Sequence, residues 1–145
     1  MPSRLRLLLV DENAAGTFVA REAFEGMGEA VGLNTCRSGR DALQALRDSQ
    51  GTPPDVVVLD INSPGQDGFG VLTAIKADPR LVHLPVVMLS DSELPADVQR
   101  AYSLRASAYV VKSREFPIFL QQIDALVGFW KLCRVMGKPI RAVAG

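Results

Sequence analysis

Short runs of apolar residues, each flanked by polar or turn residues, recur along the chain. Four runs are continuous and rich in valine or leucine, at positions 7–10, 56–59, 86–89 and 108–111. A fifth run, at 30–36, is weaker because Gly32 interrupts it. Continuous apolar runs of this length are typical of strands that are buried on both faces, as in a parallel sheet. The pattern therefore predicts five strands.

Segments with helical spacing separate these runs. Apolar residues recur at three- and four-residue steps around 18–27, 42–46, 71–75, 98–104 and 116–133. Gly28 is predicted to end the first helix, Ser38 to cap the second, and Pro95 to lie in the first turn of the fourth. The last helix is predicted to start near Glu115 and to run past Trp130. Alternation of strand and helix predicts a doubly wound α/β domain.

Length and charge narrow the function classes. The chain has 145 residues, enough for one domain, and its 16 basic and 16 acidic residues cancel. A balanced charge gives no overall attraction to nucleic acid or membrane surfaces, so neither is expected as a partner. The first apolar run is too short to span a membrane, which predicts a cytoplasmic protein. Cys36 and Cys133 are expected to be free, buried thiols.

Polar residues follow four of the predicted strands. Asp11 and Glu12 follow the first run, Asp60 the third, Ser90 the fourth and Lys112 the fifth. Ligands of a doubly wound sheet bind beyond the carboxyl ends of its strands, so these side chains are expected to converge. Each residue alone is also explained as an ordinary polar loop residue. Because all of them follow the carboxyl ends of predicted strands, a shared binding or reaction site is favoured.

The residue types indicate phosphoryl chemistry with a divalent cation. Clustered carboxylates repel one another, and Mg²⁺ relieves the repulsion because it prefers oxygen ligands. Asp60 stands alone at its strand end and is the predicted nucleophile toward phosphorus. Asp11 and Glu12 form a pair suited to holding the metal. Lys112 would offset the charge of the transferring group.

Four segments, at 8–13, 57–62, 85–90 and 109–112, resemble the response-regulator receiver family, which has the fold of the chemotaxis regulator. The resemblance covers roughly residues 6–126. It implies a flavodoxin-like, five-stranded parallel sheet in the order 2-1-3-4-5, with helices on both faces and an extended C-terminal helix. One receiver domain over 1–145 is expected, with a core of about 5–127 and a helix extension and tail over 128–145.

The resemblance also implies roles for matching residues. Asp60 would accept a phosphoryl group from a sensor histidine kinase, and Ser90 and Lys112 would contact that group. Ser90 and Tyr109 would form a conformational switch that passes the signal to protein partners, so the chain would not be an enzyme in the usual sense. Mg²⁺ (or Mn²⁺) would be held by Asp11, Glu12, Asp60 and the backbone carbonyl of Asn62.

A narrower likeness concerns the partner. Residues 76–81 and 129–132 resemble the single-domain response regulators of phytochrome-type histidine kinases, which predicts a bacteriophytochrome as the kinase. Two positions depart from the family. Ser113 stands where a proline is usual, which predicts a looser loop after Lys112. Asp91 stands where a small residue is usual, which predicts altered rates of phosphorylation or dephosphorylation.

The last helix carries a second apolar stripe near its end. A helix that is apolar on two faces needs a second partner, so a homodimer through this helix is predicted. Folding of the tail onto its own domain is the alternative. The residues of the predicted interface are Phe129, Trp130, Leu132 and Met136.

Two other functions remain open from the sequence. An aspartyl phosphatase usually carries a second acid two residues after its nucleophile, whereas Asn62 occupies that position here. A pseudo-receiver would keep the fold as a scaffold without phosphorylation. The site positions all carry chemically competent residues, which argues against the scaffold.

Overall fold

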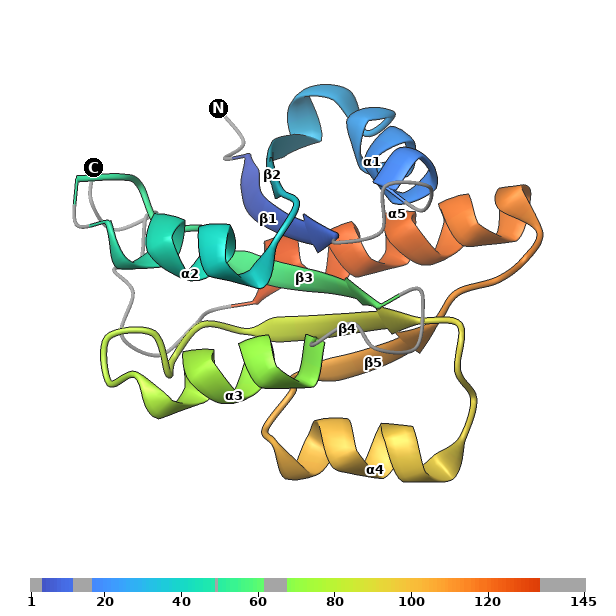
Figure 1. Cartoon of the computed structure of the whole chain (residues 1–145). Coiled ribbons are helices and arrows are strands. Elements are labelled where there is room, and N and C mark those ends of the chain that lie inside the picture. Colours follow the sequence, from blue (N-terminus) through green and yellow to red (C-terminus); the bar gives the residue numbers. More distant parts are fainter. Residues whose placement is uncertain (1–3, 12–16, 49, 62–67, 134–145) are drawn as a thin grey trace.

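A parallel sheet forms the centre of the domain. The computed structural model describes residues 4–11, 17–48, 50–61 and 68–133. Within these ranges the strands are β1 (Leu5–Asp11), β2 (Val31–Cys36), β3 (Val56–Ile61), β4 (Val86–Ser90) and β5 (Ala108–Val111). They pair in the order β2-β1-β3-β4-β5, all parallel (Figure 1). The predicted fold class and strand order are confirmed.

Helices cover both faces of this sheet. They are α1 (Thr17–Glu25), α2 (Gly39–Arg47), α3 (Gly68–Ala77), α4 (Pro95–Ser103) and α5 (Phe116–Leu132). Helices α1 and α5 lie on one face, and α2, α3 and α4 lie on the other (Figure 1). Side chains alternate along each strand, so β1 sends Leu7 and Leu9 to the first face and Leu8 and Val10 to the second. The continuous apolar runs thus supply two cores.

Most helix boundaries follow the sequence signals. The Ser38 hydroxyl accepts a hydrogen bond from the Asp41 amide at 3.0 Å, and Pro95 begins α4, both as predicted. Helix α1 ends at Glu25, earlier than predicted, because glycines at 26 and 28 lower helix propensity. Gly28 has a φ of 63°, in the left-handed region that favours glycine, and opens the 3₁₀ turn Gly28–Ala30 that leads into β2.

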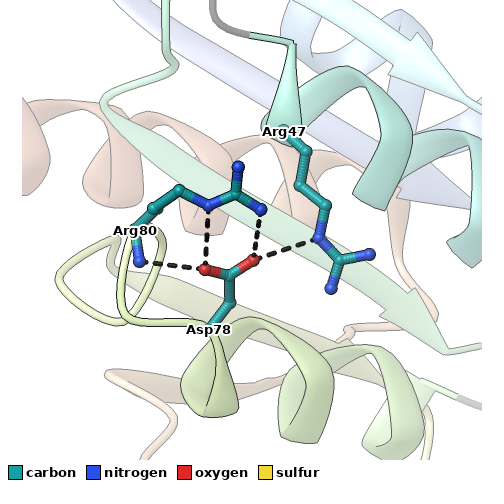
Figure 2. Close-up of polar contacts among 3 residues, drawn as sticks. All are labelled: Arg47, Asp78 and Arg80. Carbon is teal, nitrogen blue, oxygen red and sulfur yellow. Dashed lines mark hydrogen bonds and ion pairs between the residues drawn. The ribbon is translucent and has the colours of Figure 1, made fainter.

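An ion cluster joins the end of α2 to the turn after α3 (Figure 2). The Asp78 carboxylate, just after α3, accepts from Arg47 Nε at 3.1 Å and from Arg80 Nη2 at 3.2 Å. These hydrogen bonds, those of Arg80 above all, hold the pKa of the Asp78 carboxyl well below its usual range. Lys76 Nζ donates to the carbonyls of Val82 and Leu84, at 3.0 and 2.6 Å. The side chains of Lys76 and Asp78 therefore stabilise the turn between α3 and β4.

Candidate functional site

Strand register brings the predicted site residues to one edge of the sheet. Asp11 pairs with Asp60 across β1 and β3, and Ser90 pairs with Ile61 across β4 and β3. The Lys112 amide, just after β5, donates to the Ser90 carbonyl at 2.8 Å. Four residues that lie far apart in the sequence, namely Asp11, Asp60, Ser90 and Lys112, therefore end side by side.

Asp60 lies at the centre of this edge. Its side chain is fully buried, and its Oδ1 accepts a hydrogen bond from Lys112 Nζ at 2.6 Å. Its Oδ2 is also buried and faces no hydrogen-bond donor in the described ranges. Burial raises the pKa of Asp60 from 3.8 to about 7, Lys112 opposes that rise, and repulsion from Asp11 adds to it.

These two acids suit a hard divalent cation. Asp11 is only 1% exposed and neighbours Asp60, whose Oδ2 has no hydrogen-bond donor beside it in the described part of the chain. Two buried carboxylates side by side are stabilised by an oxygen-preferring cation such as Mg²⁺. The other predicted ligands, Glu12 and the Asn62 carbonyl, lie outside the described residues. Within those residues no larger group of metal-binding side chains occurs.

Ser90 leads into a hydrogen-bonded loop before α4. Its buried Oγ accepts from the Ser92 amide at 3.0 Å. The Ser92 hydroxyl donates to Asp97 in the first turn of α4 at 2.6 Å. The Ser92 carbonyl accepts from the Tyr109 hydroxyl at 2.9 Å. Ser92, which the sequence analysis did not single out, therefore connects Ser90 with α4 and with Tyr109.

Tyr109 is half-buried on β5 and packs against the core under α2, α3 and α4. Its amide donates to the Tyr102 hydroxyl of α4 at 3.1 Å. The hydroxyl of Tyr109 is thus bonded to the loop that follows Ser90, and its backbone is bonded to α4. Asp91 is exposed on that segment.

The loop after Lys112 is held by α5. Gln122 Oε1 accepts from the Ser113 amide at 3.0 Å, and Gln122 Nε2 donates to the Val111 carbonyl at 2.8 Å. A looser loop was predicted from Ser113, but the amide of this serine finds a partner that a proline could not bond. Gln122 was not predicted from the sequence. The sequence does contain a signal for it, because Gln122 is a polar residue within the apolar stripe of α5, three residues after Phe119 and four before Leu126.

The end of α5 carries the predicted interface residues in two environments. Phe129 is 60% and Leu132 83% exposed. Trp130 is half-buried, packs against the core under α1 and α5, and meets the Phe129 ring edge-on at 5.0 Å. Met136 lies outside the described residues.

Two further expectations concern thiols and membranes. Cys36 and Cys133 are free thiols, as predicted, although each is half-buried rather than buried. No helix in the described ranges has the length and apolar character needed to cross a membrane.

Comparison with known proteins gives the family. The model of the response regulator receiver domain matches residues 7–124. The probable methanogenesis regulatory protein FilR2 of Methanothrix harundinacea is 34% identical over 127 residues, which cover 86% of this chain and 82% of FilR2. Response regulator Rcp1 of Synechocystis is 30% identical over 128 residues, covering 86% of this chain and 87% of Rcp1.

Solved structures agree with this result. The phosphorylated cyanobacterial phytochrome response regulator RcpA superposes with a TM-score of 0.81 at 30% identity, covering 93% of this chain and all of RcpA. The Mn²⁺-bound form of Rcp1 gives a TM-score of 0.75 at 28% identity, covering 89% of this chain and 96% of that one. With the strand order and the acidic edge described above, these matches show that the chain belongs to the response regulator receiver domain family and resembles its phytochrome-associated members.

Proposed function

We propose that this chain is a single-domain response regulator that accepts a phosphoryl group on Asp60 from a sensor histidine kinase. The observation that carries the proposal is the buried Asp60 carboxylate, which neighbours Asp11 and accepts a hydrogen bond from Lys112 at 2.6 Å. A carboxylate with an ammonium group beside it can attack phosphorus, and the ammonium offsets the charge of the phosphoryl group. One receiver domain over 1–145, located in the cytoplasm, stays a prediction.

The chemistry is transfer of a phosphoryl group between two side chains. A carboxylate oxygen of Asp60 forms a bond to phosphorus, the phosphorus–nitrogen bond of the phosphohistidine breaks, and the departing imidazole takes up a proton. Lys112 offsets the negative charge on the phosphoryl oxygens, and the Ser90 hydroxyl donates to one of them. The phosphoryl group ends as an acyl phosphate on Asp60.

A divalent cation completes this proposed site. Asp11 and Asp60 would hold it, together with Glu12 and the backbone carbonyl of Asn62. Mg²⁺ or Mn²⁺, when bound, supplies positive charge that stabilises the carboxylates and the transferring group. The likeness to a Mn²⁺-bound structure of Rcp1 supports this assignment.

The first test is intact mass after incubation with acetyl phosphate and Mg²⁺. Wild type should gain the mass of one phosphoryl group, and Asp60→Asn, which keeps the size of the side chain, should gain none. A wild type that stays unmodified would favour the scaffold alternative. Steady turnover of a generic phosphate ester, with no lasting adduct, would favour the phosphatase.

Signal output would follow from the hydrogen bonds around Ser92. If the Ser90 hydroxyl turns toward a phosphoryl group, its hydrogen bond with the Ser92 amide changes. Ser92 also forms hydrogen bonds with Asp97 of α4 and with the Tyr109 hydroxyl. A change at Ser90 would therefore reach α4 and Tyr109 through Ser92. A small bias between two existing packings is sufficient for such a switch.

A phytochrome-type histidine kinase is the proposed partner. The likeness to RcpA and Rcp1, and the resemblance over residues 76–81, support this choice. The charge balance of the chain gives no reason to add nucleic acid or a membrane as a partner.

A homodimer through the C-terminal helix is proposed as well, supported by the exposure of Phe129 and Leu132. Replacing both with alanine should leave a monomer in sedimentation velocity, because about 25 cal/mol of hydrophobic free energy is lost for each Å² of apolar contact removed. Leu120→Ala, at a less exposed position on the same helix, is the control and should keep the wild-type mass. A dimer that persists in the double variant would reject this interface.

A further inference from the structure

The side chain of Gln122 bonds the backbone on both sides of Lys112. It lies on α5, half-buried, with its amide nitrogen 2.8 Å from the Val111 carbonyl oxygen. Its amide oxygen is 3.0 Å from the Ser113 nitrogen. Both polar ends of one side chain are thus used on the two residues that flank Lys112.

Lys112 itself is held from the other side. Its amide donates to the Ser90 carbonyl at the end of β4 at 2.8 Å. Three consecutive residues, 111–113, therefore have backbone hydrogen bonds that fix where the lysine side chain starts. Strand β5 ends at Val111, and the bond from the Lys112 amide is the only backbone hydrogen bond to β4 that any residue beyond Val111 forms in the described part of the chain. Gln122 adds side-chain hydrogen bonds to Val111 and Ser113 at this end of the strand.

A fixed starting point matters because lysine is long and flexible. Four rotatable bonds separate its backbone from the ammonium group, and each unrestrained bond widens the region that the group visits. Here the ammonium group lies 2.6 Å from Asp60 Oδ1, and the lysine side chain is only 12% exposed. Displacement of a charged group by about 1 Å can cost up to ~100-fold in rate.

We propose that Gln122 is a positioning residue that holds Lys112 in place for phosphoryl transfer to Asp60. The inference rests on the proposed function, because it assigns Gln122 a role in that same reaction. Gln122 acts through Lys112 and the backbone. It also links α5 to the backbone beside Lys112, so a partner that shifts α5 would change the phosphorylation rate.

The test compares Gln122→Met, which keeps the length of the side chain and removes both hydrogen bonds, with Gln121→Met, an exposed neighbour on the same helix. Gln122→Met is expected to be phosphorylated by acetyl phosphate about tenfold more slowly than wild type at saturating Mg²⁺. The dissociation constant for Mg²⁺, measured by calorimetry, should not change. Gln121→Met should match wild type in both.

If Gln122 had a purely structural role, Gln122→Met would change both the phosphorylation rate and the dissociation constant for Mg²⁺, or neither of them. Equal rates in wild type and Gln122→Met would overturn the inference, and so would a loss of Mg²⁺ affinity that matches the loss of rate. Gln122→Glu, which lacks the donor to Val111, should also be slower and provides the same test if Gln122→Met does not fold. A wild type that is never phosphorylated would instead reject the proposed function.

Discussion

Replacing Lys112 with methionine should slow phosphorylation of Asp60 by acetyl phosphate about 100-fold or more, the usual effect of removing one group that stabilises transition-state charge. Lys112 Nζ is 2.6 Å from Asp60 Oδ1 and largely shielded from water, so its charge acts with little screening. Methionine keeps the bulk of the side chain without the charge. The measurement is the time course of intact mass at a fixed concentration of donor and saturating Mg²⁺.

The affinity of Lys112→Met for Mg²⁺ should not fall with its phosphorylation rate. Lys112 and a bound cation both lie against the same carboxylates, so removal of the lysine charge should leave Mg²⁺ binding as tight as in wild type or tighter. The Mg²⁺ titration should be carried out above pH 8. Lys112 lowers the pKa of Asp60, so without this lysine more of the Asp60 carboxyl is protonated near neutral pH. Lys131→Met, an exposed lysine on α5, is the control. A Lys112→Met protein phosphorylated at the wild-type rate would contradict the assignment.

Replacing Asp60 with asparagine should stabilise the protein at pH 8 by up to a few kcal/mol and leave its stability nearly unchanged below pH 4. The pKa of Asp60 is raised from 3.8 to about 7 in the folded protein. Between these values the folded state binds the proton more tightly than the unfolded chain does, so wild-type stability falls as pH rises. Above pH 7 the full cost of the buried charge is present. Asparagine carries no such charge.

Thermal unfolding in the presence of a chelator measures this effect, as a midpoint several degrees higher for Asp60→Asn at pH 8. Adding Mg²⁺ at pH 8 should raise the midpoint of wild type more than that of Asp60→Asn, because a ligand stabilises the state that binds it. Asp124→Asn, which removes an exposed carboxylate on α5, is the control. Identical midpoints for Asp60→Asn and wild type across the whole pH range would contradict the charge cost assigned to Asp60.

The fold was predictable because its strands are buried on both faces. Runs such as 56–59 have few alternatives to a central parallel strand, and Ser38 and Pro95 mark helix starts through local chemistry. Strand β2 gave a weaker signal, since Gly32 interrupts it and only Val31 is fully buried. Among the described residues β2 is an edge strand that pairs with β1 alone, so its sequence is less constrained.

The positions of the site residues were predictable in part. Asp11, Asp60, Ser90 and Lys112 follow strands directly, and strand ends meet wherever the strands are parallel neighbours. Gln122 and Ser92 were not predicted, because neutral side chains that bond distant backbone groups depend on how a helix or loop docks. Such distances follow from tertiary packing and leave little trace in local sequence.

The burial of β3 has a consequence for how long the site persists. Residues 56–60 are all buried, with β1 on one side of the strand and β4 on the other. Their amide protons should exchange with solvent only when the whole domain opens, since no local fraying can reach a central strand. The residue that we propose to carry the phosphoryl group thus stands on the last part of the molecule to come apart.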